Sequence, residues 1–415
     1  MKSFFGGIAE AFEDKNFRLY SVGSIVSWLS FFVQAVAVSW TAWDLTHSTR
    51  WLAIVALMDA APNIALMPLG GVLADRCDRF RMLLISYAVA MAQAAALAGL
   101  AFAGALTIEL LSALAFVHGA AHAFSIPAQF GFMPRFIERQ RLASAISVAA
   151  AYTQLGYFVG PALAGWVILH FGTAVAFASN VAGYGVYFAS VALLRTPPGY
   201  QQPVASGKSF FADLIDGLRA IQAHCGIAAL LTLMLFGDAL AAAVRQMAPA
   251  FADKALGVGI EGYSTLLAAA GVGATIAALW LAQGGARRSA PATILSAFSG
   301  FLVATAALML APNLFFAALA MIAFGAFFEV CRTGALALLQ LSVPDALRGR
   351  VMSTQFLLLR LAGAIGVAAI GAAADSVGLR GPVLCCAAIA LIVWGLTVRR
   401  RKAIALSFAL RSNPA

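Results

Sequence analysis

The sequence Gly70-Gly-Val-Leu-Ala-Asp75-Arg-Cys-Asp-Arg-Phe-Arg81 joins two strongly apolar segments, residues 51–69 and residues 82–102. Five charged side chains fall within the seven residues 75–81. Each of them would cost about 2.5–3.5 kcal/mol at the centre of a bilayer. We therefore expect residues 70–81 to form a tight hydrophilic hairpin outside the membrane, between two helices that cross it. Glycines in the hairpin favour a turn and a close approach of helices.

The composition of the whole chain indicates a membrane protein. Of its 415 residues, 62% are hydrophobic and 11% are charged, whereas a soluble domain carries about 25% charged residues. The net charge of +10 then reflects Lys and Arg kept on the cytoplasmic side, and we expect the lipid bilayer, not nucleic acid, as the partner. The five cysteines show no C-x-x-C spacing, so neither a metal site nor a disulfide framework is expected.

Twelve apolar segments of about 20 residues, the length that crosses a bilayer as a helix, follow one another along the chain. They are residues 19–42, 51–72, 82–104, 107–128, 143–168, 173–194, 226–250, 262–284, 291–311, 314–337, 351–373 and 380–398. We therefore predict an all-α integral membrane protein with twelve transmembrane helices.

The segments divide into two six-helix bundles, residues 1–195 and 226–398. Pro, a basic cluster and Ser precede both the fifth and the eleventh segment at matching offsets, which predicts two pseudo-symmetric repeats around a site at the bilayer midplane. Residues 196–225 form a cytoplasmic linker with an expected amphipathic helix at residues 209–221. Residues 399–415 form a basic cytoplasmic tail.

The basic residues predict the orientation. With both termini inside, 21 of the 27 Lys and Arg residues fall on the inner side and three on the outer side. This bias favours a multi-pass protein of a bacterial-type inner membrane with both termini in the cytoplasm.

The opening stretch resembles the signature between the second and third helices of the major facilitator superfamily, written G-x-L-a-D-r-x-G-r-[KR]-x-[KR]. Asp78 replaces the usual second glycine, and Phe80 replaces a basic residue. The resemblance implies alternating access, with this loop packing against the helix of residues 351–373 and Asp75 near Ser353 when the protein faces outward. The residues carrying this gating role would be Gly71, Asp75, Arg76, Arg79 and Arg81.

Two further stretches, residues 40–48 and 343–351, are similar to the bacterial branch that contains enterobactin exporters and macrolide efflux pumps. The fifth segment also resembles the antiporter motif of drug exporters through Gly156, Gly160, Pro161 and Gly165, with Ala164 in place of one glycine. The resemblance implies export and a tight face between this helix and a helix of the other half. Generic packing of small residues is the alternative.

Polar groups inside apolar segments are expensive and therefore functional candidates. Since burial favours the neutral form of a carboxyl group, we expect proton coupling at Asp59, Asp238 or Glu329, with Arg245, Arg332 and Arg360 as charge modulators. The resemblance implies a cavity lined by the first, fourth, seventh and tenth helices, which makes Gln34, His118 and His122 candidates for substrate contact.

Structural roles are the alternatives for these candidates. Glu329 and Arg332 have the spacing of a helical ion pair, Asp238 has Arg245 or Arg360 as possible partners, and the histidines suit hydrogen-bonded packing better than a metal site. One feature departs from many proton-coupled exporters of the superfamily, because residues 110–129 of the fourth helix contain no arginine.

These features together predict a secondary transporter, most simply a proton-coupled exporter (antiporter) of an amphipathic small molecule such as a drug or siderophore. An importer or lysophospholipid flippase of the same fold is the alternative, and a membrane sensor or scaffold is a remote one. We expect no enzymatic activity, no ATP-binding phosphate loop, no cofactor besides the proton gradient, no metal, and a monomer.

Overall fold

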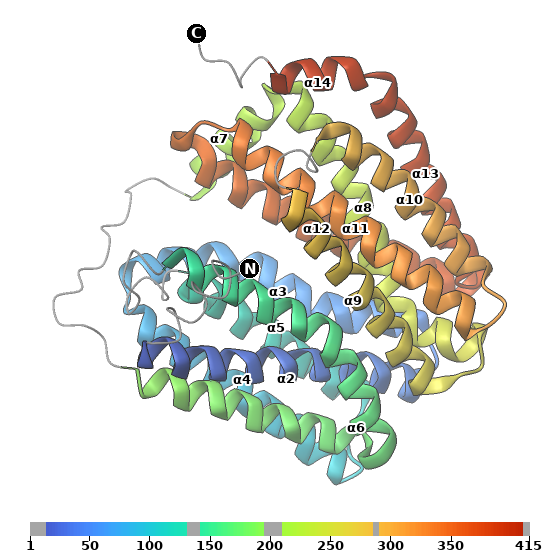
Figure 1. The fold of residues 1–415 in the computed structure, drawn as a ribbon. Helices are drawn as coiled ribbons and strands as arrows, with labels where there is room; N and C mark the ends of the chain where they lie inside the picture. The colour runs from blue at the N-terminus through green and yellow to red at the C-terminus, as the bar shows by residue number, and fades with distance from the viewer. Residues whose placement is uncertain (1–13, 131–141, 195–209, 285–289, 410–415) are drawn as a thin grey trace. The chain divides into compact units, whose positions relative to one another are not determined.

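The computed structural model describes residues 14–130, 142–194, 210–284 and 290–409, and within these ranges the chain is helical with no strand (Figure 1). The first half contains α2 (Lys15–Thr46), α3 (Thr49–Arg76), α4 (Arg79–Phe102), α5 (Ile108–Phe130) and α6 (Leu142–Ala192). The second half contains α7 (Phe210–Gln222), α8 (Cys225–Ala250), the π-helix η2 (Phe251–Ala255), α9 (Gly259–Gly284), α10 (Pro291–Leu310), α11 (Leu314–Ser342), α12 (Asp345–Val377), α13 (Arg380–Arg399) and α14 (Arg401–Ala409).

Eleven of the described helices are long and apolar enough to cross a membrane. One of them, α6, contains a break at Gly172, whose φ of 83° lies in the left-handed region that favours glycine. The break divides α6 into the fifth and sixth expected segments, so the predicted all-α fold with twelve spans is confirmed. The helix ends agree with the expected bounds to within a few residues over most of the chain, as for the segment expected at 291–311 and observed as Pro291–Leu310.

The chain folds as two compact units, of which unit 1 contains Met1–Thr46 and Met58–Gly207, and unit 2 contains His47–Leu57 and Lys208–Ala415. The first residues of α3 therefore pack with the second half of the chain, which the sequence did not indicate. The linker helix and the tail both belong to unit 2.

In unit 1, α6 packs along α2, and α4 packs against both α5 and α6 (Figure 1). Tyrosines fill the centre of this bundle: Tyr20 and Tyr187 are at most 2% exposed, and the ring centroids of Tyr87 and Tyr187 lie 4.2 Å apart. The described part of unit 1 thus has a core that is both aromatic and rich in hydroxyl groups.

In unit 2, α11 packs against α9 and α10, and α8 packs against α12. Helix α7 lies where the amphipathic linker helix is expected, and it packs against α12. Its Asp216 accepts a hydrogen bond from Arg350 Nη1 at 3.0 Å, and Gly217 leaves room for the side chain of Thr354. Ile221 of α7 is buried against the same face.

The hairpin expected at residues 70–81 is wrong in extent. Helix α3 continues to Arg76 and α4 begins at Arg79, so that only Cys77 and Asp78 separate the two helices. The helix continues past the apolar segment because its own hydrogen bonds satisfy the backbone, while charged side chains can extend into water. The turn is closed by Arg79, whose Nε donates to the carbonyl of Ala74 at 2.8 Å, and by Asp78, which caps α4 by accepting from the Phe80 N–H.

Candidate functional site

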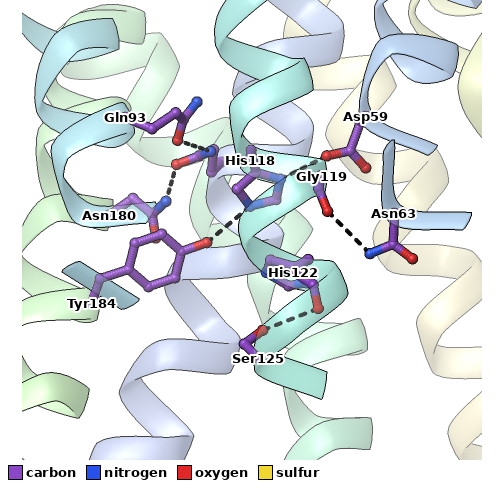
Figure 2. Close-up of polar contacts among 10 residues, drawn as sticks. Asp59, Asn63, Gln93, His118, Gly119, His122, Ser125, Asn180 and Tyr184 are labelled. Carbon is purple, nitrogen blue, oxygen red and sulfur yellow. Dashed lines mark hydrogen bonds and ion pairs between the residues drawn. The ribbon is translucent and has the colours of Figure 1, made fainter. Parts of the chain in front are cut away.

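A carboxyl–imidazole pair joins α3 to α5 within unit 1 (Figure 2). Asp59 Oδ1 and His118 Nδ1 are 2.7 Å apart, and each residue is the eleventh of its helix, α3 or α5. Ten residues of α-helix rise about 15 Å, which is half of the roughly 30 Å hydrocarbon thickness of a bilayer. The sequence named both residues as candidates, Asp59 for proton coupling and His118 for substrate contact, but did not pair them.

The surroundings of His118 suit both of its charge states. Its Nε2 lies 3.1 Å from the hydroxyl of Tyr184 on α6, and a hydroxyl can either donate or accept. With Nδ1–H donating to Asp59, a neutral imidazole accepts the Tyr184 proton at Nε2, and an imidazolium donates to the same oxygen. The pair can therefore gain or lose one proton without losing a hydrogen bond.

Aromatic side chains cover one side of this pair. The rings of His118 and His122 lie 4.5 Å apart, and the ring of Phe31 on α2 lies 6.0 Å and 5.2 Å from them. The His118 side chain is only 12% exposed, whereas that of Asp59 is 47% exposed. The carboxylate is consequently the open end of the pair, and the imidazole is the enclosed end.

Close contact between α3 and α5 sets the geometry of the pair. Gly119, the residue after His118, lies directly against the backbone carbonyl of Asp59, where a side chain would have no room. One turn further along α3, Asn63 Nδ2 lies 3.5 Å from the carbonyl of Gly119 (Figure 2). The two helices are thus held together at the level of the pair.

Three amides form a second polar cluster in unit 1. Gln34 Nε2 donates to Gln93 Oε1 at 3.2 Å, and Asn180 Nδ2 donates to Gln34 Oε1. All three side chains are at most 3% exposed. Gln34, expected to contact substrate, therefore lies enclosed within the bundle. Gln93 and Asn180 were missed, although neutral amides within apolar segments are a detectable signal.

In unit 2, Glu329 and Arg332 of α11 form the helical ion pair that their spacing predicts as the structural alternative. Glu329 is 5% exposed and accepts from Arg332 Nη2 at 2.8 Å and from Arg332 Nε at 3.2 Å. Thr333 Oγ1 donates to the same carboxylate at 2.5 Å. Since its oxygens are already used by two neighbours, this carboxylate has the contacts of a structural group.

Asp238 on α8 is a different kind of carboxylate. Its Oδ2 is buried and accepts no hydrogen bond from any residue that the structure describes. Its charged neighbours are the three arginines that the sequence named as modulators: Arg245, Arg332 and Arg360. Two of them also lie over aromatic rings of unit 2, Arg245 over Phe328 and Arg360 over Phe356.

The antiporter-like motif of α6 faces a helix of its own unit. A Cβ on Gly156 would lie 3.1 Å from the ring of Phe32, and Gly160 lies against Cβ of the same residue on α2. Pro161 and Gly165 are buried as well. Gly156 and Gly160 thus accommodate the bulky Phe32 of unit 1, and the expected contact with the other half stays a prediction.

The remaining candidates of the opening stretch lie at the end of α3 and at the start of α4. Arg76 and Arg81 are exposed, and a Cβ on Gly71 would meet no atom within 4 Å. The side chain of Asp75 lies outside what the structure describes. In the described part of the chain, no three His, Cys, Asp or Glu side chains gather where they would hold a metal ion.

Comparison with known proteins agrees with this architecture. A major facilitator family model described as transmembrane secretion effector matches residues 8–409. Macrolide efflux protein A of Streptococcus pyogenes is 22% identical over 232 residues, which are 55% of this chain and 57% of that protein. The match thus spans little more than half the length of that relative. The enterobactin exporter EntS of Shigella boydii is 28% identical over 350 residues, covering 81% of this chain and 79% of the exporter.

Solved structures with the same fold include transporters at low sequence identity. A bacterial homologue of the human lysosomal transporter Spinster aligns with a TM-score of 0.75 at 14% identity, covering 96% of this chain and 98% of the homologue. The nucleoside transporter NupG aligns with a TM-score of 0.71 at 13% identity, covering 93% and 98%.

Proposed function

The chain belongs to the transmembrane secretion effector family of the major facilitator superfamily, and from this premise we propose that it exports an amphipathic small molecule in exchange for protons. It is a transporter and not an enzyme. The observation that carries the proposal is the pair of Asp59 and His118 at the middle of two spanning helices.

The pair meets the physical requirements of a proton carrier. An ionisable group inside a membrane span is costly and is retained where it has a function. Histidine can bind or release a proton at a ring nitrogen, as a proton carrier must. The hydroxyl of Tyr184 provides a partner for His118 in either state.

Antiport also requires that proton and substrate exclude each other. The half-exposed carboxylate of Asp59 offers a contact for a polar or cationic group of a substrate. A proton on the pair neutralises the negative charge that attracts such a group, and this differential affinity shifts the balance between the two access states. The aromatic rings of Phe31 and His122 beside the pair suit the apolar part of an amphipathic molecule.

The direction and the substrate class rest on the relatives. A macrolide efflux protein and an enterobactin exporter are both similar to this chain. Efflux and export by these relatives favour export of a drug-like or siderophore-like molecule over import. The proton gradient supplies the driving force, with no cofactor.

The charges of unit 2 have a secondary role in this proposal. Asp238 is the second candidate carrier, because its Oδ2 is buried and accepts no hydrogen bond from the described residues. The positive charges of Arg245, Arg332 and Arg360 would stabilise the negative charge of this carboxylate. Glu329 ranks last, since Arg332 and Thr333 already bind its carboxylate.

We further propose that the protein works as a monomer in a bacterial inner membrane with both termini in the cytoplasm. The distribution of Lys and Arg along the chain supports this orientation. The end of α3 and the start of α4, with Arg76, Arg79 and Arg81, would then lie on the cytoplasmic side, as the gating role of this segment requires.

The test uses inside-out vesicles that contain the protein and a pH-sensitive dye. The vesicles are energised, and macrolides, siderophores, lipophilic cations and lysolipids are added one at a time. We expect proton release with at least one class of compound. Asp59→Asn and His118→Gln should each abolish that release.

The control is Asp44→Asn, which removes an exposed carboxylate from α2 of the same unit and should leave proton release intact. Release that survives Asp59→Asn but is lost in Asp238→Asn would move the carrier to unit 2. Uptake of a radiolabelled compound into these vesicles without any proton release would refute proton coupling, and loss of a preloaded compound from them would favour import.

A further inference from the structure

We propose that the four consecutive basic residues Arg399–Lys402, at the joint between α13 and α14, bind the phosphate headgroups of anionic phospholipids. The proposal concerns a surface of unit 2 that is separate from the transport site. It does not depend on the direction of transport or on proton coupling.

The depth of the four residues follows from the helix that precedes them. Helix α13, Arg380–Arg399, has 20 residues, and an α-helix of that length extends about 30 Å, the thickness of the hydrocarbon core. The residues at its end therefore reach the level of the lipid headgroups. At Arg400 the helix ends and the chain turns into α14, which runs at an angle to α13 (Figure 1).

Helix α14 is fixed to the protein. Ile404 is 1% exposed, and Ser407 and Phe408 lie against Gly226 in the first turn of α8, where a side chain would have no room. The ring of Phe408 is 5.1 Å from that of His224, the residue that caps α8. The basic residues are thus held on a packed element in defined positions.

The charges of this surface are not balanced within the protein. All four side chains from Arg399 to Lys402 are exposed, and none forms an ion pair with a residue that the structure describes. Residues 399–415 contain no Asp or Glu. Such a cluster directly after a transmembrane helix is the sequence pattern of anionic-lipid recognition.

Lipid phosphate fits this cluster better than a carboxylate partner in solution. Three of the four residues are arginines, whose planar guanidinium groups bind phosphate oxygens through two parallel hydrogen bonds. At the depth of the lipid headgroups, phosphate oxygens are the nearest hydrogen-bond acceptors for these arginines. The retention of Lys and Arg on the cytoplasmic side explains why this cluster is positively charged. It does not explain why the cluster lies beside a helix that is packed against the protein.

The experiment measures lipid retention by native mass spectrometry on the purified full-length protein in non-ionic detergent. Dioleoylphosphatidylglycerol and dioleoylphosphatidylcholine are added in equal amounts. We expect a preference for phosphatidylglycerol, and we expect Arg400→Gln/Arg401→Gln to lower its affinity about 30-fold. The pair Arg400→Lys/Arg401→Lys keeps the charge and should keep most of the preference.

The matched control is Arg287→Gln/Arg288→Gln, which removes two adjacent charges elsewhere in the chain. An equal loss in this control would overturn the proposal, because net charge alone would then explain binding. Equal retention of the two lipids by the unmodified protein would overturn it as well. Displacement of phosphatidylglycerol by an equal concentration of inorganic phosphate would indicate a general anion site instead of a lipid site.

Discussion

The backbone carbonyl of Asp59 on α3 occupies the space that a side chain on Gly119 of α5 would need. This contact fixes the separation of the two helices one residue away from His118, whose Nδ1 lies 2.7 Å from the Asp59 carboxylate. The absence of a side chain at position 119 is therefore a condition for the pair.

Gly119→Ala should disrupt both packing and coupling. The added methyl group must push α3 away from α5, because backbone and not a flexible side chain blocks it. We expect the free energy of unfolding to fall by about 1–3 kcal/mol and substrate-induced proton release to be lost. Thermal unfolding in detergent and the vesicle assay measure the two effects.

Gly99→Ala is the control for this substitution. Gly99 lies in the last turn of α4, where a Cβ would meet no atom within 4 Å, and alanine is a better helix former than glycine by up to about 1 kcal/mol. Gly99→Ala should therefore leave the free energy of unfolding unchanged or raise it. Normal proton release by Gly119→Ala would mean that the pair of Asp59 and His118 does not carry the coupling.

Loss of Arg332 should lower the free energy of unfolding more than loss of Glu329, its partner in the ion pair. Arg332→Gln leaves a carboxylate that is 5% exposed without its cation, which costs about 3–5 kcal/mol. Glu329→Gln should cost less, about 1–3 kcal/mol, because the Arg332 side chain is 45% exposed and can be hydrated.

The double variant Glu329→Gln/Arg332→Gln should be more stable than Arg332→Gln alone. Denaturation of the four proteins gives the coupling energy of the pair. We also expect Glu329→Gln to keep substrate-induced proton release. Loss of release in a fully stable Glu329→Gln protein would contradict the structural role.

Asp375 on α12 caps the start of α3 within unit 2. Its Oδ1 accepts from the Thr49 N–H at 3.2 Å and from Ser48 Oγ at 3.0 Å. Asp375→Ala removes this cap and should lower the free energy of unfolding by about 1 kcal/mol. Asp375→Asn retains an oxygen acceptor and should lose less. Thermal unfolding of both variants checks the order, and equal stability of Asp375→Ala and the unmodified protein would exclude the capping role.

Much of the fold could be predicted because a bilayer fixes the length of the helices that cross it. The segment expected at 380–398 is the helix Arg380–Arg399, and the break expected between 168 and 173 is the turn at Gly172. Helix ends outside the hydrocarbon were harder to predict. In α3, the helix continued from the apolar segment through charged residues to Arg76, because helical hydrogen bonding does not require an apolar side chain.

The residues of the candidate site could be predicted from the sequence, but the contacts between them could not. Asp59 and His118 stand out as ionisable residues in apolar segments, yet 59 positions separate them and a single sequence does not say which faces of their helices meet. Gly156 and Gly160 illustrate the same limit: a small-residue motif indicates close packing, whereas its partner, Phe32, is identified only by the structure.

A gating role for the end of α3 is implied by the sequence signature of residues 70–81. Asp75→Asn keeps the size of the side chain and removes its charge. If the end of α3 controls access by packing against another helix in one of two states, this charge biases the balance between them by a few kcal/mol. We expect the rate of transport to fall at least tenfold, while thermal unfolding changes little. Gly71→Leu should act in the same way, because the space around Gly71 is open in the state described and must close when the segment packs.

Asp78→Asn provides the control for the gate. Asp78 lies three residues away and caps α4 through a hydrogen bond from the Phe80 N–H at 3.0 Å. Asparagine caps helices about as well as aspartate, so this variant removes a charge from the same segment without loss of the cap. It should transport normally. Near-normal transport by both Asp75→Asn and Gly71→Leu would remove the gating assignment, whereas slow transport by all three variants would assign the effect to the net charge of the segment.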